Sequence, residues 1–248
     1  MKDFRKIWLE EENHAFSGWD FSHLNGRVET DPLPWEYREE VLRGLEPSHR
    51  LLDMCTGGGE FLMMLGHPCE NTSVTEGYAP NLALCQRTLA PLGVEVLESD
   101  GEGALPFGDA RFDRVINRHG SYLPSEIYRI LRPGGRFVTQ QVGAWNCFDL
   151  RARLGFQVPA SAHDLAHEVA RFEAAGFRIL RAEENMGRYR FFDTGAVVFQ
   201  AKIIEWEFPG FSVEKNWNQL VDIQREIEEK GFVEGAEHRF LIVAEKGV

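Results

Sequence analysis

The chain has 248 residues, which is enough for one large domain or for one domain with an insertion. Its formal net charge at pH 7 is −12, and this acidic balance argues against a nucleic-acid substrate because neutralising phosphates supplies most nucleic-acid affinity. The sequence contains no apolar run of about 18 residues, so we expect neither a membrane span nor a membrane partner.

The cysteines and the N-terminal residues indicate a compartment. Cys55, Cys69, Cys85 and Cys147 have neither the spacing of metal ligands nor that of a disulfide framework. Residues 1–12 are too charged for a secretory signal. We therefore expect reduced thiols, no bound metal and a cytoplasmic location.

Residues 1–48 are rich in aromatic side chains, among them Trp19 and Trp35. A helix is expected over residues 35–45, and the stretch before Pro32 is expected to be irregular. These rings either pack on the edge of a sheet or cover a site, where large rings exclude water. The sequence leaves both interpretations open.

The most informative pattern lies in residues 51–62. A short apolar run ends at Asp53, and three consecutive glycines, Gly57 to Gly59, precede a second apolar pattern. This order predicts a buried parallel strand, a tight turn and the start of a helix. Ligands of open α/β sheets bind at the carboxyl ends of the strands, so the turn predicts a nucleotide-like ligand. An ordinary strand-to-helix loop is the alternative.

Absent residues narrow the choice of ligand. A dinucleotide fingerprint needs a third glycine where Leu62 stands, and a phosphate-binding loop needs a lysine where Glu60 and Phe61 follow the turn. Asp53 and Glu60 would repel phosphate, whereas carboxylates suit a cationic or hydroxyl-rich ligand. S-adenosylmethionine, with its sulfonium, ammonium and ribose hydroxyls, fits these requirements.

At this turn the sequence resembles the class I S-adenosylmethionine-dependent methyltransferases. Asp53 matches the acid of their first motif, and Gly57 and Gly59 match its second and third glycines. Cys55 stands at the position of the first glycine, which is a departure from the motif. We interpret Cys55 as a small, inert residue at the floor of the site.

A second strand is expected over residues 73–76, with a helix over 78–92. Glu76 follows Asp53 at close to the spacing of about 20 residues at which an acid meets ribose hydroxyls. A solvated glutamate at the end of a strand is the alternative. A third strand is expected over 94–97, and the resemblance implies that Asp100, just after it, hydrogen-bonds the adenine amino group.

Two further landmarks follow in the order that the family shows. Residues 112–117 predict a fourth strand, and residues 126–138 predict a helix, a turn and a fifth strand. Arg132-Pro133-Gly134-Gly135 supplies the turn, because proline ends a helix and glycine adopts positive φ. The resemblance covers residues 51–141 well and extends more weakly to the C-terminus.

The resemblance implies positions for the cofactor as well as for the reacting groups. The expected cofactor site is formed by Asp53, Cys55, Thr56, Gly57, Gly59, Glu76, Gly77, Asn81, Asp100, Gly101, Asn117 and Arg118. His119 follows the fourth strand and is the candidate general base, because its unperturbed pKa suits proton transfer near pH 7. A loop histidine that only packs against the cofactor is the alternative. The expected substrate contacts are Trp19, Trp35, Tyr122, Gln140 and Gln141.

The remaining sequence predicts a longer end to the domain than a plain family member needs. A loop is expected over 142–159, a helix over 163–175, a strand over 177–182 and the last strand over 239–244. The segment between these strands is too long for a structureless loop, and it contains a predicted helix over 213–230. We interpret it as a cap over the substrate side, with a dimer contact as the alternative.

The expected fold is therefore a Rossmann-like, doubly wound, seven-stranded, mostly parallel α/β sheet with an antiparallel C-terminal strand. The expected divisions are a lid (1–48), a core (49–186), an inserted cap or dimer contact (187–235) and the last strand (236–248). The expected activity is S-adenosylmethionine-dependent methyl transfer to nitrogen or oxygen of a small or medium-sized molecule. The alternatives are an RNA or protein methyltransferase and a non-catalytic S-adenosylmethionine-binding protein. The sequence leaves a homodimer open.

Overall fold

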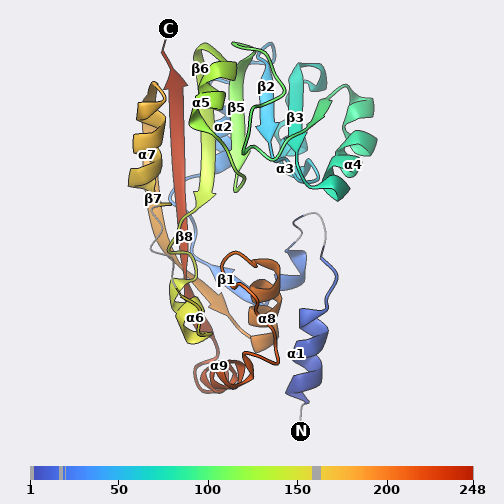
Figure 1. Cartoon of the computed structure of the whole chain (residues 1–248), viewed down its shortest axis with the longest axis vertical. Helices are drawn as coiled ribbons and strands as arrows, with labels where there is room; N and C mark the ends of the chain where they lie inside the picture. Colours follow the sequence, from blue (N-terminus) through green and yellow to red (C-terminus); the bar gives the residue numbers. More distant parts are fainter. Residues whose placement is uncertain (1–2, 17–18, 20, 158–162, 248) are drawn as a thin grey trace. The chain divides into compact units, whose positions relative to one another are not determined.

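The computed structural model of the chain describes residues 3–16, 19, 21–157 and 163–247. Within these residues one sheet has eight strands in the order β1-β7-β8-β6-β5-β2-β3-β4 (Figure 1). The chain divides into two compact units. Unit 1 comprises residues 1–33, 144–162 and 185–238, and unit 2 comprises residues 34–143, 163–184 and 239–248.

Unit 2 contains the parallel part of the sheet. Its strands are β2 (Leu51–Met54), β3 (Thr72–Glu76), β4 (Glu95–Glu98), β5 (Phe112–Arg118) and β6 (Leu131–Val142). β2 pairs in parallel with both β3 and β5, β3 pairs with β4, and β5 pairs with β6. The chain therefore runs outward from β2 to β4 and then returns to the other side of β2 at β5. Such a reversal of strand order is where open α/β sheets bind ligands.

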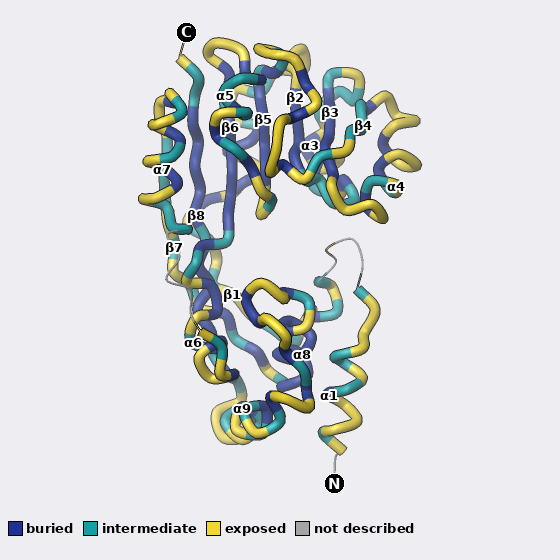
Figure 2. The backbone as a smooth tube through the Cα atoms, viewed as in Figure 1, coloured by how far each residue is buried: buried dark blue, intermediate teal, exposed yellow. Residues whose placement is uncertain are grey.

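Helices alternate with these strands. They are α2 (Tyr37–Leu42), α3 (Glu60–Leu65), α4 (Ala79–Thr88), α5 (Pro124–Ile130) and α7 (Leu165–Ala174), with short 3-10 helices η2 (Cys69–Asn71) and η3 (Ala90–Leu92). β2 and β3 are buried along their whole length, as Figure 2 shows. Strands that are covered on both faces have continuous apolar sequences, and the apolar residues of 51–54 therefore predict a parallel strand.

Alternate residues of β6 serve the two faces of the sheet. Phe137 stacks on Phe172 of α7, with ring centroids 5.5 Å apart. On the neighbouring position, the backbone oxygen of Val138 accepts a hydrogen bond from the hydroxyl of Tyr37 in α2, at 3.2 Å. The apolar cluster around Phe137 contains residues of unit 2 alone, so this unit has a core of its own.

β7 (Phe177–Phe191) and β8 (Val233–Lys246) are long strands whose residues are divided between the two units. β8 pairs antiparallel with β6, from Arg136 opposite Glu245 to Val142 opposite Arg239. β1 (Val28–Thr30) pairs antiparallel with the end of β7. The antiparallel C-terminal strand expected from the sequence is confirmed.

Unit 1 is built around helix α8 (Thr194–Ile203), in which residues 194–201 are all buried. The other helices of this unit are α1 (Phe4–Glu12), α6 (Phe148–Arg153) and α9 (Trp217–Lys230), with a 3-10 helix η1 (Ser22–Leu24). Trp8 of α1, Leu150 of α6 and Leu220 of α9 belong with α8 to one buried apolar cluster. Figure 2 shows α8 as buried, with α9 carrying an exposed face.

The expected α/β fold is confirmed, with local corrections. The sheet has eight strands within the described residues rather than seven, because β1 adds to the edge at β7. Residues 148–153 form helix α6 inside the segment expected to be a loop over 142–159, the end of which, residues 158–159, lies outside the described residues. The predicted strands 177–182 and 239–244 are the starts or middles of longer strands.

The Pro-Gly-Gly turn also differs from the prediction. β6 already begins at Leu131, which is opposite Phe112, and regular pairing resumes only where Arg136 is opposite Arg114. Residues 132–135 therefore form an irregular, bulged start of the strand, with Gly134 at φ 76°. A bulge accommodates the extra residues without ending the pairing.

Candidate functional site

The glycine turn after β2 forms one wall of the candidate site. Cys55, Gly57 and Gly59 have φ values of 56°, 67° and 87°, a conformation that glycine adopts freely and that is unusual for cysteine. The amide of Thr56 donates to the backbone oxygen of Thr75, 3.1 Å away, which ties the turn to the end of β3. Gly59 is the residue that precedes α3.

Glu76, the last residue of β3, holds this turn through its carboxylate. Its Oε2 accepts a hydrogen bond from the amide of Gly57 at 2.8 Å, and its Oε1 accepts one from the amide of Tyr78 at 2.8 Å. The side chain is 5% exposed. Each carboxylate oxygen retains acceptor capacity, so Glu76 both fixes the backbone of the turn and is able to accept ligand hydroxyls.

Asp53 is a second buried carboxylate, one residue before the end of β2. Its Oδ2 accepts a hydrogen bond from the hydroxyl of Thr56 at 2.6 Å. Burial raises the pKa of Asp53 to about 7, and the nearby charge of Glu76 adds to the rise, while Thr56 and Arg118 oppose it. A buried carboxylate of this kind is stabilised in its charged form by a cation.

Backbones of the loops after β2, β3, β4 and β5 approach one another closely. A Cβ added at Gly101 would lie 2.2 Å from the oxygen of Ser121, and one added at Gly77 would lie 2.8 Å from Cα of Asp100. At Gly120 an added Cβ would lie 2.6 Å from Cβ of Cys55. Glycine is therefore required at these positions by close approach, and the contacts bring the four loops to one place.

Cys55 lies within this junction as a half-buried thiol. Its Sγ donates to the backbone oxygen of Asp100, 3.7 Å away. Burial raises the pKa of Cys55 to about 12, and the carboxylates of Glu76, Asp53 and Asp100 add to the rise. The thiol is therefore protonated at neutral pH and unreactive.

One polar group of the site has no protein partner in the described part of the chain. Asn81 lies in the first turn of α4 and is 2% exposed, and its Nδ2 makes no hydrogen bond there. Leaving a buried amide unpaired costs about 1–3 kcal/mol. A buried donor left free in the first turn of α4, shortly after Glu76 in the chain, is expected where a ligand supplies the acceptor.

Three side chains form a hydrogen-bonded row at the ends of β5 and β6. The indole Nε1 of Trp35 donates to Oε1 of Gln140 at 2.8 Å, and Nε2 of Gln140 lies 3.2 Å from Nε2 of His119. The backbone amide of His119 also donates to the oxygen of Gln140, at 2.9 Å. Trp35 and Gln140 are 5% and 7% exposed, whereas His119 is exposed.

The pKa of His119 is lowered from its ordinary value. Although part of the residue is exposed, the protein around its ring disfavours the charged form through desolvation, and the positive charges of Arg239 and Arg118 act in the same direction. Arg118 itself lies over the ring of Phe61, 4.5 Å from its centroid. His119 is therefore neutral at pH 7.

Comparison with known families bears on this arrangement. Residues 52–139 match the family model described as a methyltransferase domain. Demethylmenaquinone methyltransferase of Thermus thermophilus is 35% identical over 117 residues, which are 43% of this chain and 53% of that protein. Phthiotriol/phenolphthiotriol dimycocerosates methyltransferase of Mycobacterium tuberculosis is 31% identical over 109 residues, 39% of each chain.

The matched segment contains the glycine turn, Glu76 and His119. Residues 52–139 of this chain are therefore similar to a methyltransferase domain. The chain spans about half of the length of the first of these curated relatives and less of the second.

Solved structures share the fold of this chain at low sequence identity. A protein from Deinococcus radiodurans R1, described as functionally unknown, superposes with a TM-score of 0.58 and 15% identity over 100% of both chains. Geranyl diphosphate methyltransferase superposes with a TM-score of 0.52 and 16% identity over 85% of this chain and 83% of that one.

Unit 2 gathers most of the residues that the sequence singles out. Hydrogen bonds, ring contacts or close backbone approaches join the candidate cofactor residues Asp53, Cys55, Thr56, Gly57, Glu76, Gly77, Asp100 and Gly101. Asn81, Arg118 and His119 flank this group on α4 and after β5. Their roles toward a ligand stay predictions.

Other expected residues lie in different surroundings. The hydroxyl of Tyr122 donates to Glu168 at 3.0 Å, and the ring packs in the core against Phe137. The amide of Asn117 is 0% exposed and is bonded to the oxygen of Met54 and to Gln141.

The remaining expected substrate residues do not lie together: two are on opposite faces of the sheet, and the two tryptophans belong to different units. Gln140 and Gln141 point to opposite faces of β6, as successive strand residues must. Trp19 belongs to unit 1, where its ring meets that of Trp206 at 5.8 Å, whereas Trp35 belongs to unit 2.

Two residues that contact the candidate site were not predicted from the sequence. The ring of Phe61 in α3 stacks against the guanidinium of Arg118. The Sγ of Cys85 in α4 donates a hydrogen bond to the backbone oxygen of Gly57 at 3.1 Å. Phe61 follows the glycine turn directly, so its position was a usable signal. Cys85 gave none, because on α4 it reads as one member of an apolar stripe.

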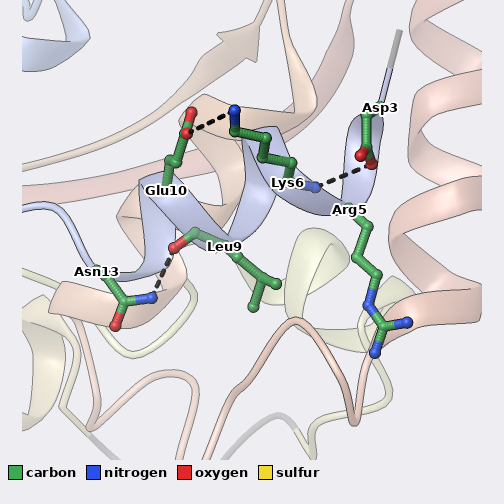
Figure 3. Close-up of a pocket in the computed structure, with 6 residues that line it drawn as sticks. All are labelled: Asp3, Arg5, Lys6, Leu9, Glu10 and Asn13. Atoms are coloured by element: carbon green, nitrogen blue, oxygen red, sulfur yellow. Dashed lines mark hydrogen bonds and ion pairs between the residues drawn. The ribbon is translucent and has the colours of Figure 1, made fainter. Parts of the chain in front are cut away.

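A surface hollow in unit 1 has a different character (Figure 3). It is lined by Asp3, Arg5, Lys6, Leu9, Glu10 and Asn13, all on or beside α1. Its polar contacts run along the helix, from the amide of Lys6 to Asp3 at 3.2 Å and from Asn13 to the oxygen of Leu9 at 2.7 Å. These hydrogen bonds satisfy backbone groups at the two ends of α1. The polar groups that line the hollow do not point toward one common position that a ligand could occupy.

Proposed function

We propose that the chain is an S-adenosylmethionine-dependent methyltransferase that methylates nitrogen or oxygen of a small or medium-sized molecule. The observation that supports it most is the pairing of two buried carboxylates, Asp53 and Glu76, around a glycine turn without a lysine. This set suits a ligand with a cation and hydroxyl groups and disfavours a phosphate.

The residues of the site fit this cofactor. No protein atom lies within 4 Å of a Cβ added at Gly57, so the turn is open on that side. Among the described residues, Asn81 offers an unpaired donor, and Glu76 offers free acceptor capacity at the end of the strand that precedes it. S-adenosylmethionine would supply a methyl group already activated on a sulfonium. Asp53, Glu76 and Asn81 would then hold the cofactor by its charged and hydroxyl groups.

The protein's contribution to the reaction is chiefly alignment. Methyl transfer is an in-line displacement, and holding the acceptor in line contributes roughly 7–11 kcal/mol. His119 is neutral and exposed beside this site. We keep it as the residue that faces the acceptor, and its role as a general base stays a prediction.

Relatives support methyl transfer more than any one acceptor. Their names give different substrates: demethylmenaquinone, phthiotriol/phenolphthiotriol dimycocerosates and, for a Bradyrhizobium relative that is 31% identical over 114 residues, protein L-isoaspartate. The small-molecule acceptor is our proposal, with a protein or RNA acceptor and binding without catalysis as the alternatives. The roles expected for residues 1–48 as a lid and for residues 187–235 as a cap or dimer contact stay predictions. The described residues include no helix that is both long and apolar enough to cross a membrane.

Ligand binding by the full chain tests the proposal. Isothermal titration with S-adenosylmethionine and S-adenosylhomocysteine should show binding, whereas NAD and ATP should show none. Binding of NAD or ATP alone would refute the cofactor assignment. Salt-sensitive binding of RNA would move the RNA alternative ahead, and cofactor binding without methyl transfer to any acceptor pool would favour the binding protein.

A further inference from the structure

The row Trp35–Gln140–His119 determines which ring nitrogen of His119 carries its proton. An indole Nε1–H is a donor only, so the group of Gln140 that faces Trp35 at 2.8 Å is the amide oxygen. The amide nitrogen of Gln140 then faces Nε2 of His119 at 3.2 Å. An amide NH2 has no acceptor, so Nε2 of His119 accepts and the ring proton lies on Nδ1.

Burial holds this assignment in place. Trp35 and Gln140 are almost fully enclosed, so an amide turned the other way would set its NH2 against the indole N–H inside the protein. Leaving such buried donors unpaired costs about 1–3 kcal/mol. The backbone bond from His119 to Gln140 fixes the two residues side by side.

Two effects disfavour a second proton on the His119 ring. A protonated Nε2 would point an N–H at the NH2 of Gln140. Arg118 and Arg239, the charged groups that act on the ring, are both positive. The ring is therefore neutral as well as fixed in one tautomer.

We propose that Trp35 and Gln140 are positioning residues that hold His119 as the neutral Nδ1–H tautomer, whose free ring edge offers a hydrogen-bond donor to an oxygen of the methyl-accepting substrate. The proposal rests on the methyltransferase function for the identity of the substrate, but not for the tautomer. It selects substrates that bring a carbonyl, carboxylate or deprotonated hydroxyl oxygen next to His119. It also reassigns His119 from general base to donor, because Nδ1 already carries a proton and Nε2 is occupied.

Nitrogen NMR of the histidine rings tests the tautomer directly. In the full chain labelled with 15N-histidine, two-bond spectra at pH 7 should show His119 as Nδ1–H. His67 is an internal reference for the opposite tautomer, because its Nε2 lies 2.9 Å from the oxygen of His49, which only accepts. His119 in the Nε2–H form would overturn the proposal.

Two variants test the roles of the positioning residues. Gln140→Glu presents a carboxylate that accepts from both Trp35 and His119, so His119 should move its proton to Nε2 or become charged. Trp35→Phe removes the indole donor, so both tautomers should appear. Gln86→Glu, at an exposed position of α4, and Trp145→Phe, in unit 1, are matched controls that should leave the His119 signals unchanged. Unchanged His119 signals in Gln140→Glu would show that Gln140 does not set the tautomer of His119.

Turnover separates a donor from a base. Asparagine places an amide N–H near the position of Nδ1–H, tolerates the positive φ of 63° at this residue, and is not basic. A donor role predicts that His119→Asn retains much of the kcat/KM that His119→Ala loses. Equal losses of about 10²-fold or more in both variants would restore the base and overturn the donor. Failure of S-adenosylmethionine to bind the wild-type chain would refute the proposed function and leave the NMR assignment standing.

Discussion

The two units of this chain differ in how their cores are assembled. Unit 2 takes its parallel strands and most of its helices from residues 34–143, where β2 pairs with β3 and β3 pairs with β4. Helix α7 and parts of β7 and β8 join it from residues 163–184 and 239–248. Unit 1 is spread more evenly over residues 1–33, 144–162 and 185–238, and its central helix α8 is surrounded by side chains from α1, α6 and α9. Most of unit 2 therefore comes from one continuous stretch of sequence, whereas unit 1 is assembled from stretches that lie far apart in the sequence.

The units also use charge differently. Unit 2 keeps Asp53 buried without a cation in hydrogen-bonding contact, and its pKa is raised to about 7. In unit 1, Asp193 precedes α8 and is paired with Arg27 at 2.6 Å. Burial acts to raise the pKa of Asp193, but hydrogen bonds from Arg27 and from the amide of Ala196 outweigh it and lower the pKa. In unit 2 the buried Asp53 lowers the stability of the folded chain at neutral pH. In unit 1 Asp193 stabilises the start of α8 and links it to Arg27.

The largest expected effect tests whether the cores are separate. Phe199→Ala in α8 and Phe172→Ala in α7 each remove a ring that is at most 1% exposed, and each should lower the free energy of unfolding by about 3–5 kcal/mol. Urea unfolding followed by fluorescence measures this. If the units unfold independently, each variant shifts one of two transitions. A single transition shifted equally by both would show that the units unfold together.

The next effect concerns the sign of a pH dependence. The pKa of Asp53 is raised from 3.8 to about 7 on folding, so the folded state takes up a proton across that window and stability falls as pH rises through it. Asp53→Asn keeps the acceptor for Thr56 and should be more stable than the wild type at pH 8, by up to a few kcal/mol at about 1.4 kcal/mol per pKa unit. Melting temperatures at pH 5 and pH 8 measure the difference, which should be smaller at pH 5.

Asp193→Asn is the matched comparison in unit 1. Because the folded pKa of Asp193 lies below its unfolded value, its stabilisation is present above the unfolded pKa and is lost as pH falls through the folded pKa. This variant should therefore be less stable than the wild type at both pH 5 and pH 8. The same sign of change in both Asp variants at pH 8 would contradict the contrast between the units.

Glu76→Ala should weaken S-adenosylmethionine binding by about 1–3 kcal/mol, because hydroxyl acceptors are lost and the amides of Gly57 and Tyr78 lose their partner. Calorimetric titration measures the affinity. Glu98→Ala, at the exposed end of β4, is the control and should bind normally. An unchanged affinity in Glu76→Ala would remove Glu76 from the site.

The smallest effect is expected at the surface of unit 1. Arg5 and Glu214 form an ion pair at 2.7 Å with side chains 61% and 55% exposed. Solvent screens such pairs, so Arg5→Ala should cost only about 0.2–1 kcal/mol of stability. Thermal unfolding at low and high salt measures it. A loss as large as that of Phe199→Ala would mean that α1 is held by this pair more than by Trp8.

Much of unit 2 could be predicted from the sequence because its signals are local. A buried strand, a glycine turn and an acid at the end of the next strand are properties of short stretches, and the position of Asp53 and Glu76 follows from them. The prediction of the Pro-Gly-Gly turn was less accurate, since whether residues 132–135 end a helix or bulge a strand depends on the neighbouring strand β5. The roles of the site residues toward ligands stay predictions.

The sequence by itself determined the order of strands and helices in unit 2 and the chemistry of the turn, since backbone conformation and burial pattern are written in neighbouring residues. Only the tertiary structure decided that residues 194–203 form the centre of unit 1 and that Trp35 meets Gln140, 105 residues away. These contacts depend on which segments pack together, and no periodicity in one segment specifies its partner. The proton on His119 is a consequence of that packing.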